Sequence, residues 1–210
     1  MQCIGLRGLL QKLLGQKWVS QGLLEFNNIC QFRKKGLQTV IPVAAGERYK
    51  GFFWVESFLV TKDFSPWKSL EFIIAKEQDF FLGSEGKERK RILIKKVARS
   101  AKKMHTSGLN HRDFNATHIL LYYESKSTCP QVAFYDLQRV EKCWITSFRW
   151  KTKSLARLNY SLPSDLFNIT EKKNILMYYK NKSKFGLLES LGWLFIRNKI
   201  SKIKRHTQKK

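Results

Sequence analysis

The stretch Leu109-Asn-His-Arg-Asp-Phe-Asn-Ala-Thr-His-Ile-Leu-Leu121 decides the fold, because it places polar and charged side chains between a long helical pattern and a short apolar run. A second acidic residue follows 23 residues after Asp113, within Phe134-Tyr-Asp-Leu137. Asp113 precedes one apolar run and Asp136 ends the next. If the two runs pair as a β-hairpin, the turn returns Asp136 to the end where Asp113 lies.

Hydrophobic periodicity and turn residues define the elements around the two acids. We predict a helix over 88–105 that ends at Gly108. Its buried face would comprise Leu93, Ile94, Val97, Ala98, Ala101 and Met104. The predicted elements that follow are a polar loop over 110–118, a strand over 119–123, a turn over 124–130 and a strand over 132–135.

Two carboxylates and an imidazole would then converge, because His118 lies five residues after Asp113, at the start of the first hairpin strand. Phosphoryl transfer needs such a set: one acid accepts a hydroxyl proton, and oxygen or nitrogen ligands hold the metal on the nucleotide phosphates. The alternative is that Asp113 and Asp136 are loop carboxylates that pair with some of the 40 lysines and arginines.

The first part of the chain predicts a helix and a small sheet. The helix would run from the N-cap Ser20 to Gly36, with Leu23, Phe26, Ile29 and Cys30 on one face. Two strands are predicted over 40–45 and 52–61, with a turn over 46–51 between them and a linker over 62–66. Beyond Trp150 the pattern is helical again. Strands first and helices later predict an α+β fold with a small sheet lobe and a larger helical lobe.

Two basic segments lie at the ends of the chain. Leucines at helical spacing alternate with Arg7, Lys12 and Lys17, which fits either a helix packed on the domain or a basic amphipathic helix on anionic lipid. The apolar stripe comprises Leu6, Leu9, Leu10, Leu13 and Leu14. The last 14 residues, from Arg197, hold seven lysines and arginines and no acid. This tail is either a solvated end or a contact with an acidic surface.

Composition bounds the class of protein. With 210 residues and 43% hydrophobic residues the chain can bury a core, which excludes wholesale disorder. The net charge of +24 favours polyanionic partners. The four cysteines lack a CxxC pair, which indicates a reducing compartment. No apolar run is long enough to span a bilayer, and the first residues do not form a signal peptide. We expect a cytoplasmic protein.

The motif His-Arg-Asp-Phe-Asn-Ala-Thr-His, with Asp-Leu-Gln-Arg further on, resembles the catalytic loop and metal-binding segment of the protein-kinase-like fold. The histidine at its end and the Leu-Gln after Asp136 resemble more specifically the bacterial lipopolysaccharide kinases, which phosphorylate Kdo or heptose in the inner core. Supporting likenesses cover 37–48, 57–62, 153–161 and 168–170. The resemblance extends over roughly residues 8 to 185.

The resemblance implies a role for each residue of the motif. Asp113 would be the catalytic base and Asp136 would bind Mg²⁺ on the phosphates of ATP. His118 would be the second residue on the metal side. Because Mg²⁺ prefers oxygen, we expect His118 to contact phosphate or a ligand water. His111 would pack beneath the loop, as in other kinase-like domains.

Other roles are implied further from the motif. Glu25 stands where kinase-like enzymes carry the helix glutamate beside the ATP phosphates. Arg112 and Lys151 are candidates for binding substrate phosphates. Upstream of Glu25 there is no GxGxxG loop and no V-A-I-K-like strand. The resemblance therefore implies a two-lobed fold with a truncated N-terminal lobe.

The implied organisation has three parts: a partial N-lobe over 1–62 with its hinge near 57–62, a helical C-lobe over 63–196, and the basic tail over 197–210. The C-lobe would carry the catalytic loop over 109–121 and the metal segment over 134–137. The implied function is ATP- and Mg²⁺-dependent phosphorylation of Kdo or heptose on a lipopolysaccharide precursor. It would take place on the anionic inner membrane, from the cytoplasmic side.

Two other functions stay open. A catalytically degenerate kinase-like protein would bind lipid or a partner without transferring phosphate. A basic nucleic-acid-binding protein would bind duplex DNA or RNA with steep salt dependence and without regard to Asp113 or Asp136. No helix-turn-helix, zinc or RNP-type signature supports the second alternative, so no nucleic acid is expected as a partner.

Overall fold

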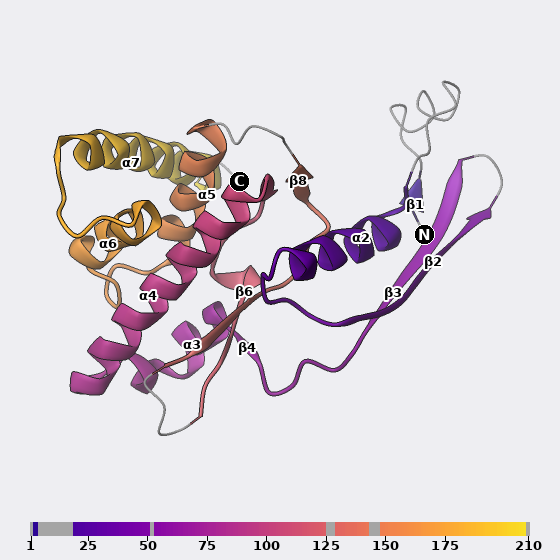
Figure 1. Cartoon of the computed structure of the whole chain (residues 1–210), viewed down its shortest axis with the longest axis horizontal. Coiled ribbons are helices and arrows are strands. Elements are labelled where there is room, and N and C mark those ends of the chain that lie inside the picture. Colours follow the sequence, from indigo (N-terminus) through magenta and orange to yellow (C-terminus); the bar gives the residue numbers. More distant parts are fainter. Residues whose placement is uncertain (1, 4–18, 51–52, 125–128, 143–147, 209–210) are drawn as a thin grey trace.

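The computed structural model describes residues 2–3, 19–50, 53–124, 129–142 and 148–208 (Figure 1). The predicted amphipathic helix near the N-terminus, with Lys12 and Lys17, lies outside these described residues. Most of the predicted turn over 124–130 lies outside them too.

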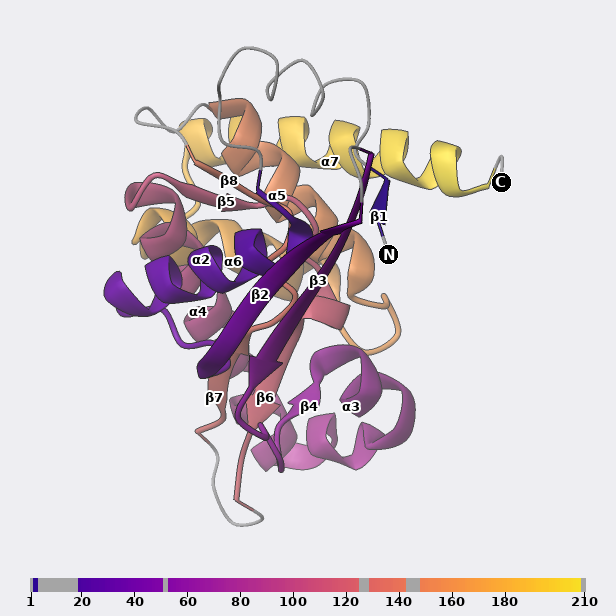
Figure 2. The same ribbon diagram turned by 90° about the vertical axis from the view of Figure 1, so that its right-hand side faces the viewer.

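One sheet and one helix lie at one end of the molecule, and most helices gather at the other (Figures 1 and 2). The helices are α2 (Gln21–Lys34), α3 (Leu70–Lys76), α4 (Gly83–Thr106), α5 (Phe148–Ser161), α6 (Ile169–Lys180) and α7 (Leu187–Thr207), with short 3₁₀ helices η1 (Gln78–Phe81) and η2 (Ala116–His118). The strands are β1 (Gln2–Cys3), β2 (Pro42–Lys50), β3 (Trp54–Thr61), β4 (Lys68–Ser69), β5 (Leu109–His111), β6 (Ile119–Tyr122), β7 (Gln131–Phe134) and β8 (Val140–Lys142). Among these elements the sheet orders are β1-β3-β2, β4-β6-β7 and β5-β8.

Helix α2 lies close to strand β3 and follows the prediction, with Ser20 at its N-cap position and Gly36 just after it in the left-handed region (φ 64°). Gly22 permits the close approach, since a Cβ there would lie 2.7 Å from the carbonyl oxygen of Phe58. The backbone N–H of Gly22 donates to the hydroxyl of Ser57 at 3.2 Å. This packing fixes α2 on the hairpin.

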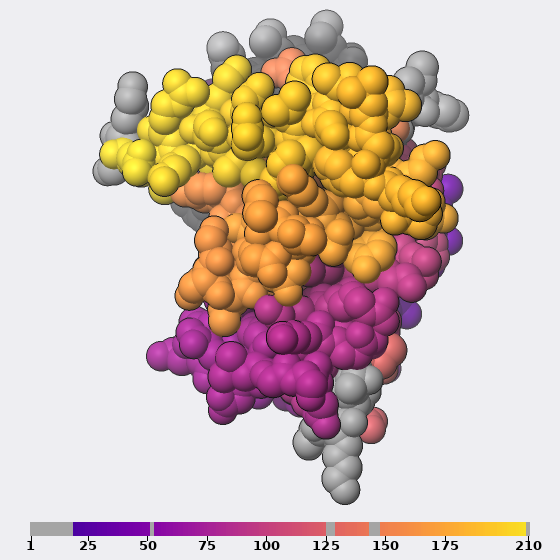
Figure 3. All heavy atoms as spheres, turned by 90° about the vertical axis from the view of Figure 1, so that its left-hand side faces the viewer, coloured from indigo at the N-terminus to yellow at the C-terminus, as the bar shows by residue number. Residues whose placement is uncertain are grey.

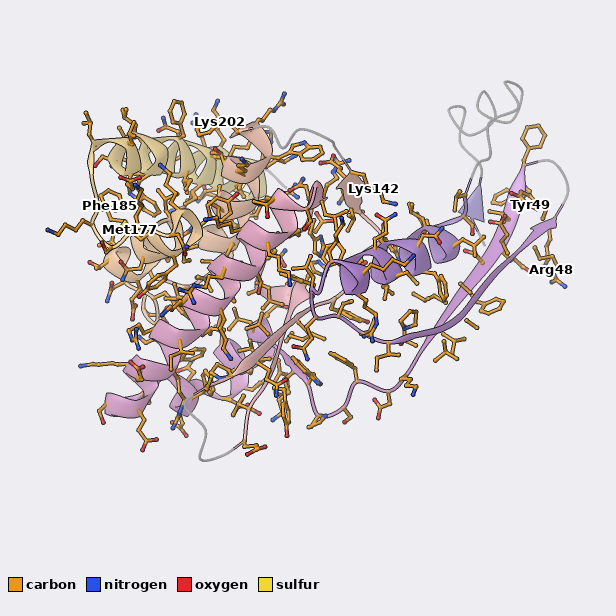
Figure 4. The ribbon with its side chains drawn as sticks, viewed as in Figure 1. Arg48, Tyr49, Lys142, Met177, Phe185 and Lys202 are labelled. Atoms are coloured by element: carbon orange, nitrogen blue, oxygen red, sulfur yellow. The ribbon has the colours of Figure 1, made fainter. Side chains whose placement is uncertain are left out.

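The β2–β3 hairpin is longer than the sequence predicted, and the turn expected over 46–51 was wrong. Gly46 to Lys50 continue β2 and pair with β3, with Gly46 opposite Phe58. A Cβ at Gly46 would lie 2.7 Å from the Phe58 ring, so this glycine makes room for an aromatic side chain across the sheet. Figure 4 shows Arg48 and Tyr49 at the far end of the hairpin.

Helix α4 forms the centre of the core. It begins at Gly83, five residues before the predicted start, and the six residues predicted for its inner face are all buried. The same hydrophobic core includes residues from α2, α3, α5 and α6. Gly108 follows the helix with φ 76°, as a chain stop requires.

The loop predicted over 110–118 contains two short elements. Residues Leu109–His111 form β5, which pairs with β8, and Ala116–His118 form η2. The predicted hairpin is confirmed: β6 and β7 are antiparallel, with Ile119 opposite Phe134. The hairpin therefore carries the residues just after Phe134 back to the level of His118.

Helices α6 and α7 cover the upper part of one outer face of the molecule (Figure 3). The basic segment from Arg197 continues α7 as far as Thr207 rather than leaving the helix. No helix among the described residues combines the length and apolar character needed to cross a membrane.

Candidate active site

His111 lies at the centre of the site and joins the two predicted acids. Its Nδ1 accepts a hydrogen bond from the backbone N–H of Asp113 at 3.3 Å, so the proton of the neutral ring is on Nε2, which donates to the carbonyl of Tyr135 at 3.1 Å. Burial lowers the pKa of His111 to about 4. A neutral, buried ring thus connects Asp113 to the residue before Asp136, and His111 packs beneath the loop as predicted.

Two arginines hold the carboxylate of Asp113. The Arg139 Nη1 lies 2.9 Å from its Oδ2 and 3.1 Å from its Oδ1, and the Arg157 Nη1 lies 3.2 Å from Oδ1. Arg139 stands three residues after Asp136, and Arg157 comes from α5. The side chain of Asp113 is a quarter exposed, so a ligand can reach it. Sequence reasoning assigned neither arginine to the site.

Asp136 lies where β7 has ended, with its backbone in the left-handed region at φ 54°. Aspartate tolerates this region better than most residues, but at a cost, and such strain concentrates at functional sites. Its Oδ2 lies 3.7 Å from the Nδ1 of His118, which is too far for a hydrogen bond. That Nδ1 is buried and has no hydrogen-bond partner in the described structure.

Local structure fixes the position of His118. The side chain of Asn115 caps η2 and accepts from the backbone N–H of His118 at 3.3 Å. The carbonyl of His118 accepts from the N–H of Tyr135 at 3.0 Å, and its ring centroid lies 5.4 Å from that of His111. His118, His111 and Asp136 therefore form one cluster at the open end of the β6–β7 hairpin.

Helix α2 reaches this cluster through Glu25 and Asn28. The Oε1 of Glu25 accepts from the backbone N–H of Leu137 at 3.2 Å, and the Nδ2 of Asn28 donates to the carbonyl of Leu137 at 2.7 Å. Burial is the main cause that raises the pKa of Glu25, and the negative charge of Asp136 raises it further. Glu25 therefore lies beside Asp136. Asn28 was not identified from the sequence.

The two residues predicted to bind substrate phosphate lie apart. The Nε of Arg112 lies 3.5 Å from Oε1 of Glu141, at the edge of the cluster. Lys151 acts on His105, whose pKa is lowered mainly by burial and also by the charge of Lys151. At 100° per residue Lys151 lies about 120° around α5 from Arg157, so the structure brings Arg157 rather than Lys151 to Asp113. A role of either residue in phosphate binding stays a prediction.

The side chains of Asp136 and His118 fit a metal ion that arrives with a nucleotide better than a metal ion held by protein ligands alone. Within the described ranges, no group of three or more His, Cys, Asp or Glu side chains is placed to hold a metal ion. Mg²⁺ bound with substrate phosphates needs only one or two protein carboxylates, and keeps several waters. Asp136 supplies one carboxylate, and the unpartnered Nδ1 of His118 beside it is placed to bond to a phosphate oxygen or a ligand water.

Comparison with known proteins agrees with this geometry. The heptose(I) kinase WaaP of lipopolysaccharide core synthesis from Escherichia coli is 34% identical over 139 residues, which is 65% of this chain and 51% of that protein. WaaP of Pseudomonas aeruginosa is 32% identical over the same length and the same shares. The chain thus spans about half the length of the curated relatives that it matches.

The fold is shared with a solved structure, described as WaaP in complex with acyl carrier protein, at a TM-score of 0.71 and 27% identity. The match covers 86% of this chain and 76% of that one, and it confirms the predicted α+β, protein-kinase-like fold. A sequence profile described as the lipopolysaccharide kinase (Kdo/WaaP) family matches residues 18–179, which include both acids and all of the residues around them described above. The chain therefore belongs to the lipopolysaccharide kinase (Kdo/WaaP) family.

Proposed function

We propose that this chain transfers the γ-phosphoryl group of ATP to a hydroxyl of Kdo or heptose in the lipopolysaccharide inner core. The observation that carries the proposal is the link through His111, which bonds to the backbone of Asp113 on one side and to Tyr135, next to Asp136, on the other. A proton acceptor and a metal-binding carboxylate are thereby held in a fixed relation. Relatives named as heptose(I) kinases support the choice of acceptor.

In this proposal Asp113 orients the acceptor hydroxyl and accepts its proton during transfer. Asp136 would hold a Mg²⁺ ion, and that ion would supply positive charge to stabilise the transferring phosphoryl group. The Nδ1 of His118 contacts a phosphate oxygen or a ligand water. Glu25 acts from α2 by holding the backbone of Leu137, and so positions Asp136 for the nucleotide.

The test is transfer of labelled phosphate from Mg·ATP to a Kdo-lipid A or heptose-containing acceptor. Asp113→Asn is expected to lower kcat by about 10²–10⁴-fold, the usual contribution of a general base, and to keep Mg·ATP affinity. Asp136→Ala is expected to abolish Mg·ATP binding. Asp165→Asn, at an exposed position outside the cluster, is the control and should match the wild type.

Two results would contradict this assignment. Transfer by Asp113→Asn at the wild-type rate would remove Asp113 from the role of base. A folded wild-type protein that binds acceptor but transfers no phosphate to either sugar would support the catalytically degenerate alternative instead.

We also propose that the protein associates peripherally with the cytoplasmic face of an anionic membrane. Leu187 and Leu188 at the start of α7 are 79% and 71% exposed, and the +24 charge of the chain favours an anionic surface. Co-sedimentation with phosphatidylglycerol vesicles should fall at high salt and in Leu187→Ser/Leu188→Ser. Equal binding to neutral phosphatidylcholine vesicles would refute the electrostatic part of this proposal.

A further inference from the structure

Helix α5 and the part of α7 that follows Glu189 form a surface without acidic side chains of their own. Residues 142–164 and 190–210 contain no aspartate or glutamate, in a chain that has 16 of them. The two helices lie side by side (Figure 2) and enclose a groove of about 390 Å³. The groove lining includes Phe148, Arg149, Lys153, Phe195, Lys199 and Lys202. Among the described residues, no acidic side chain forms an ion pair with any of these four cations.

This groove leads to Asp113 along one face of α5. Arg149, Lys153 and Arg157 follow one another at intervals of four residues and so form a row about 12 Å long on one side of the helix. Arg149 and Lys153 line the groove, whereas Arg157 contacts the carboxylate of Asp113 at 3.2 Å. The groove and the candidate active site are therefore two ends of one cationic row.

The charges in the row act on one another. The pKa of Lys153 is lowered first by burial and then by the positive charges of Arg157 and Arg112, and Lys199 on α7 lowers it too, whereas the negative charge of Glu141 opposes the shift. Like charges gathered in this way repel, and a bound anion reverses the sign of the interaction. Arginine offers up to five N–H donors, so Arg157 has donors left for a second anion while it holds Asp113.

The groove also has an apolar wall suited to a bulky ligand. The rings of Phe148 and Phe195 meet edge to face with centroids 5.3 Å apart, and they are 59% and 53% exposed. Figure 4 places Lys202 on α7 beside α5. An exposed aromatic pair beside these cations matches a ligand that combines anionic groups with the C–H faces of sugar rings, as a phosphorylated or carboxylated glycan does.

We propose that the groove between α5 and α7 binds the phosphate or carboxylate groups of the acceptor glycan, and that the row Arg149–Lys153–Arg157 leads the acceptor hydroxyl to Asp113. This inference rests on the proposed function, because it names the part of the acceptor that the same active site recognises. It assigns Lys153, Lys199 and Lys202 to acceptor binding and leaves nucleotide binding to the cluster around Asp136.

The experiment compares two double variants that remove the same charge from the same helix. Lys199→Gln/Lys202→Gln empties the groove of its α7 cations, whereas Arg197→Gln/Lys204→Gln removes two cations that line a separate pocket beside Trp193. The probe is a water-soluble, de-acylated oligosaccharide that carries Kdo and phosphate, and binding to the full chain is measured by titration calorimetry. Lys199→Gln/Lys202→Gln should raise the Kd for the oligosaccharide by about tenfold or more. Arg197→Gln/Lys204→Gln, the control, should raise it by less than about twofold.

Two further arms identify the source of the effect. Lys199→Arg/Lys202→Arg keeps the charge and should restore binding, and thermal unfolding establishes that each variant is folded. Phosphatidylglycerol vesicles without sugar distinguish a lipid headgroup from the glycan. Loss of vesicle binding together with unchanged oligosaccharide binding in Lys199→Gln/Lys202→Gln would make the groove a membrane contact and overturn the proposal.

The outcome separates this inference from the proposed function, since calorimetry needs no turnover. Selective loss of oligosaccharide binding supports the groove even if no transfer is found. Equal losses in the two double variants, or wild-type protein that does not bind the oligosaccharide, would overturn the groove. Transfer activity with an unchanged acceptor KM in Lys199→Gln/Lys202→Gln would overturn it while the kinase proposal stands.

Discussion

The side chain of Asn28 donates a buried hydrogen bond of 2.7 Å to the carbonyl of Leu137, across 109 residues of sequence. Three residues earlier on the same helix, Glu25 accepts from the N–H of Leu137. Both backbone groups of the residue after Asp136 are therefore held by α2. Because of this arrangement, a substitution in α2 is expected to alter the position of Asp136 although the substituted side chain does not contact it.

Asn28→Ala tests this coupling. The change leaves a buried carbonyl of Leu137 without its donor, and it should lower the free energy of unfolding by about 1–3 kcal/mol. Mg·ATP affinity should fall as well, because Asp136 loses its support. Urea denaturation and nucleotide titration measure the two effects. Asn27→Ala, at the exposed neighbouring position, is the matched control, and an equal effect there would refute a specific role for Asn28.

Glu25→Gln should separate stability from nucleotide binding. The raised pKa means that the folded state binds the proton of Glu25 more tightly than the unfolded state, whose reference value is 4.5. The stability that Glu25 contributes is therefore complete below pH 4.5. It is lost as the pH rises through the raised pKa of the folded state. At pH 7 the glutamine variant should be at least as stable as the wild type in urea. It should bind Mg·ATP less tightly, because its neutral amide oxygen accepts from the N–H of Leu137 more weakly than a carboxylate does. The difference in unfolding free energy between the variant and the wild type is the quantity to compare at the two pH values. If it favours the variant less at pH 7 than at pH 4, this prediction is contradicted.

The sequence predicted those parts of the fold that depend on one periodic pattern. The inner face of α4 follows from a single apolar stripe, and all six of its residues are buried. The β2 turn failed because Gly46 resembles a turn glycine, whereas its function is to accommodate Phe58 on the opposite strand. Such a contact depends on strand register, which the local sequence does not specify.

The candidate site was predictable only where its residues share one motif. Asp113 and His118 lie just before the hairpin that the apolar runs defined, and Asp136 lies just after it. Arg139 and Arg157 contact Asp113 from 26 and 44 residues away, and nothing in the local pattern distinguishes them from the other basic residues, 40 in all. The Asp-Leu-Gln-Arg motif was the one signal that could have identified Arg139.

Acid should destabilise the protein through two buried histidines. Burial lowers the pKa of His105 and of His111 to about 4, from a reference of 6.5. Between these values the unfolded state binds protons that the folded state does not, so stability is full above 6.5 and falls as the pH drops toward 4. Each histidine contributes at most on the order of 3 kcal/mol. Urea denaturation between pH 7 and 5 measures the slope.

Variants show whether the histidines cause this slope. His105→Gln removes one of the two groups and should reduce the pH dependence to about half. His206→Gln, at the exposed end of α7, is the control and should keep the wild-type slope. An unchanged slope in His105→Gln would assign the acid lability to other groups.

Asp136→Gly and Asp136→Ala both remove the carboxylate, but they differ in their tolerance of the left-handed backbone at φ 54°. A Cβ in this region costs about 1–2 kcal/mol, so the glycine variant should be the more stable of the two by about 1 kcal/mol in urea denaturation. Both should lose Mg·ATP binding, because neither offers an oxygen ligand. Equal stability would argue against strain at Asp136, and retained Mg·ATP binding in the glycine variant would exclude this carboxylate as the metal ligand.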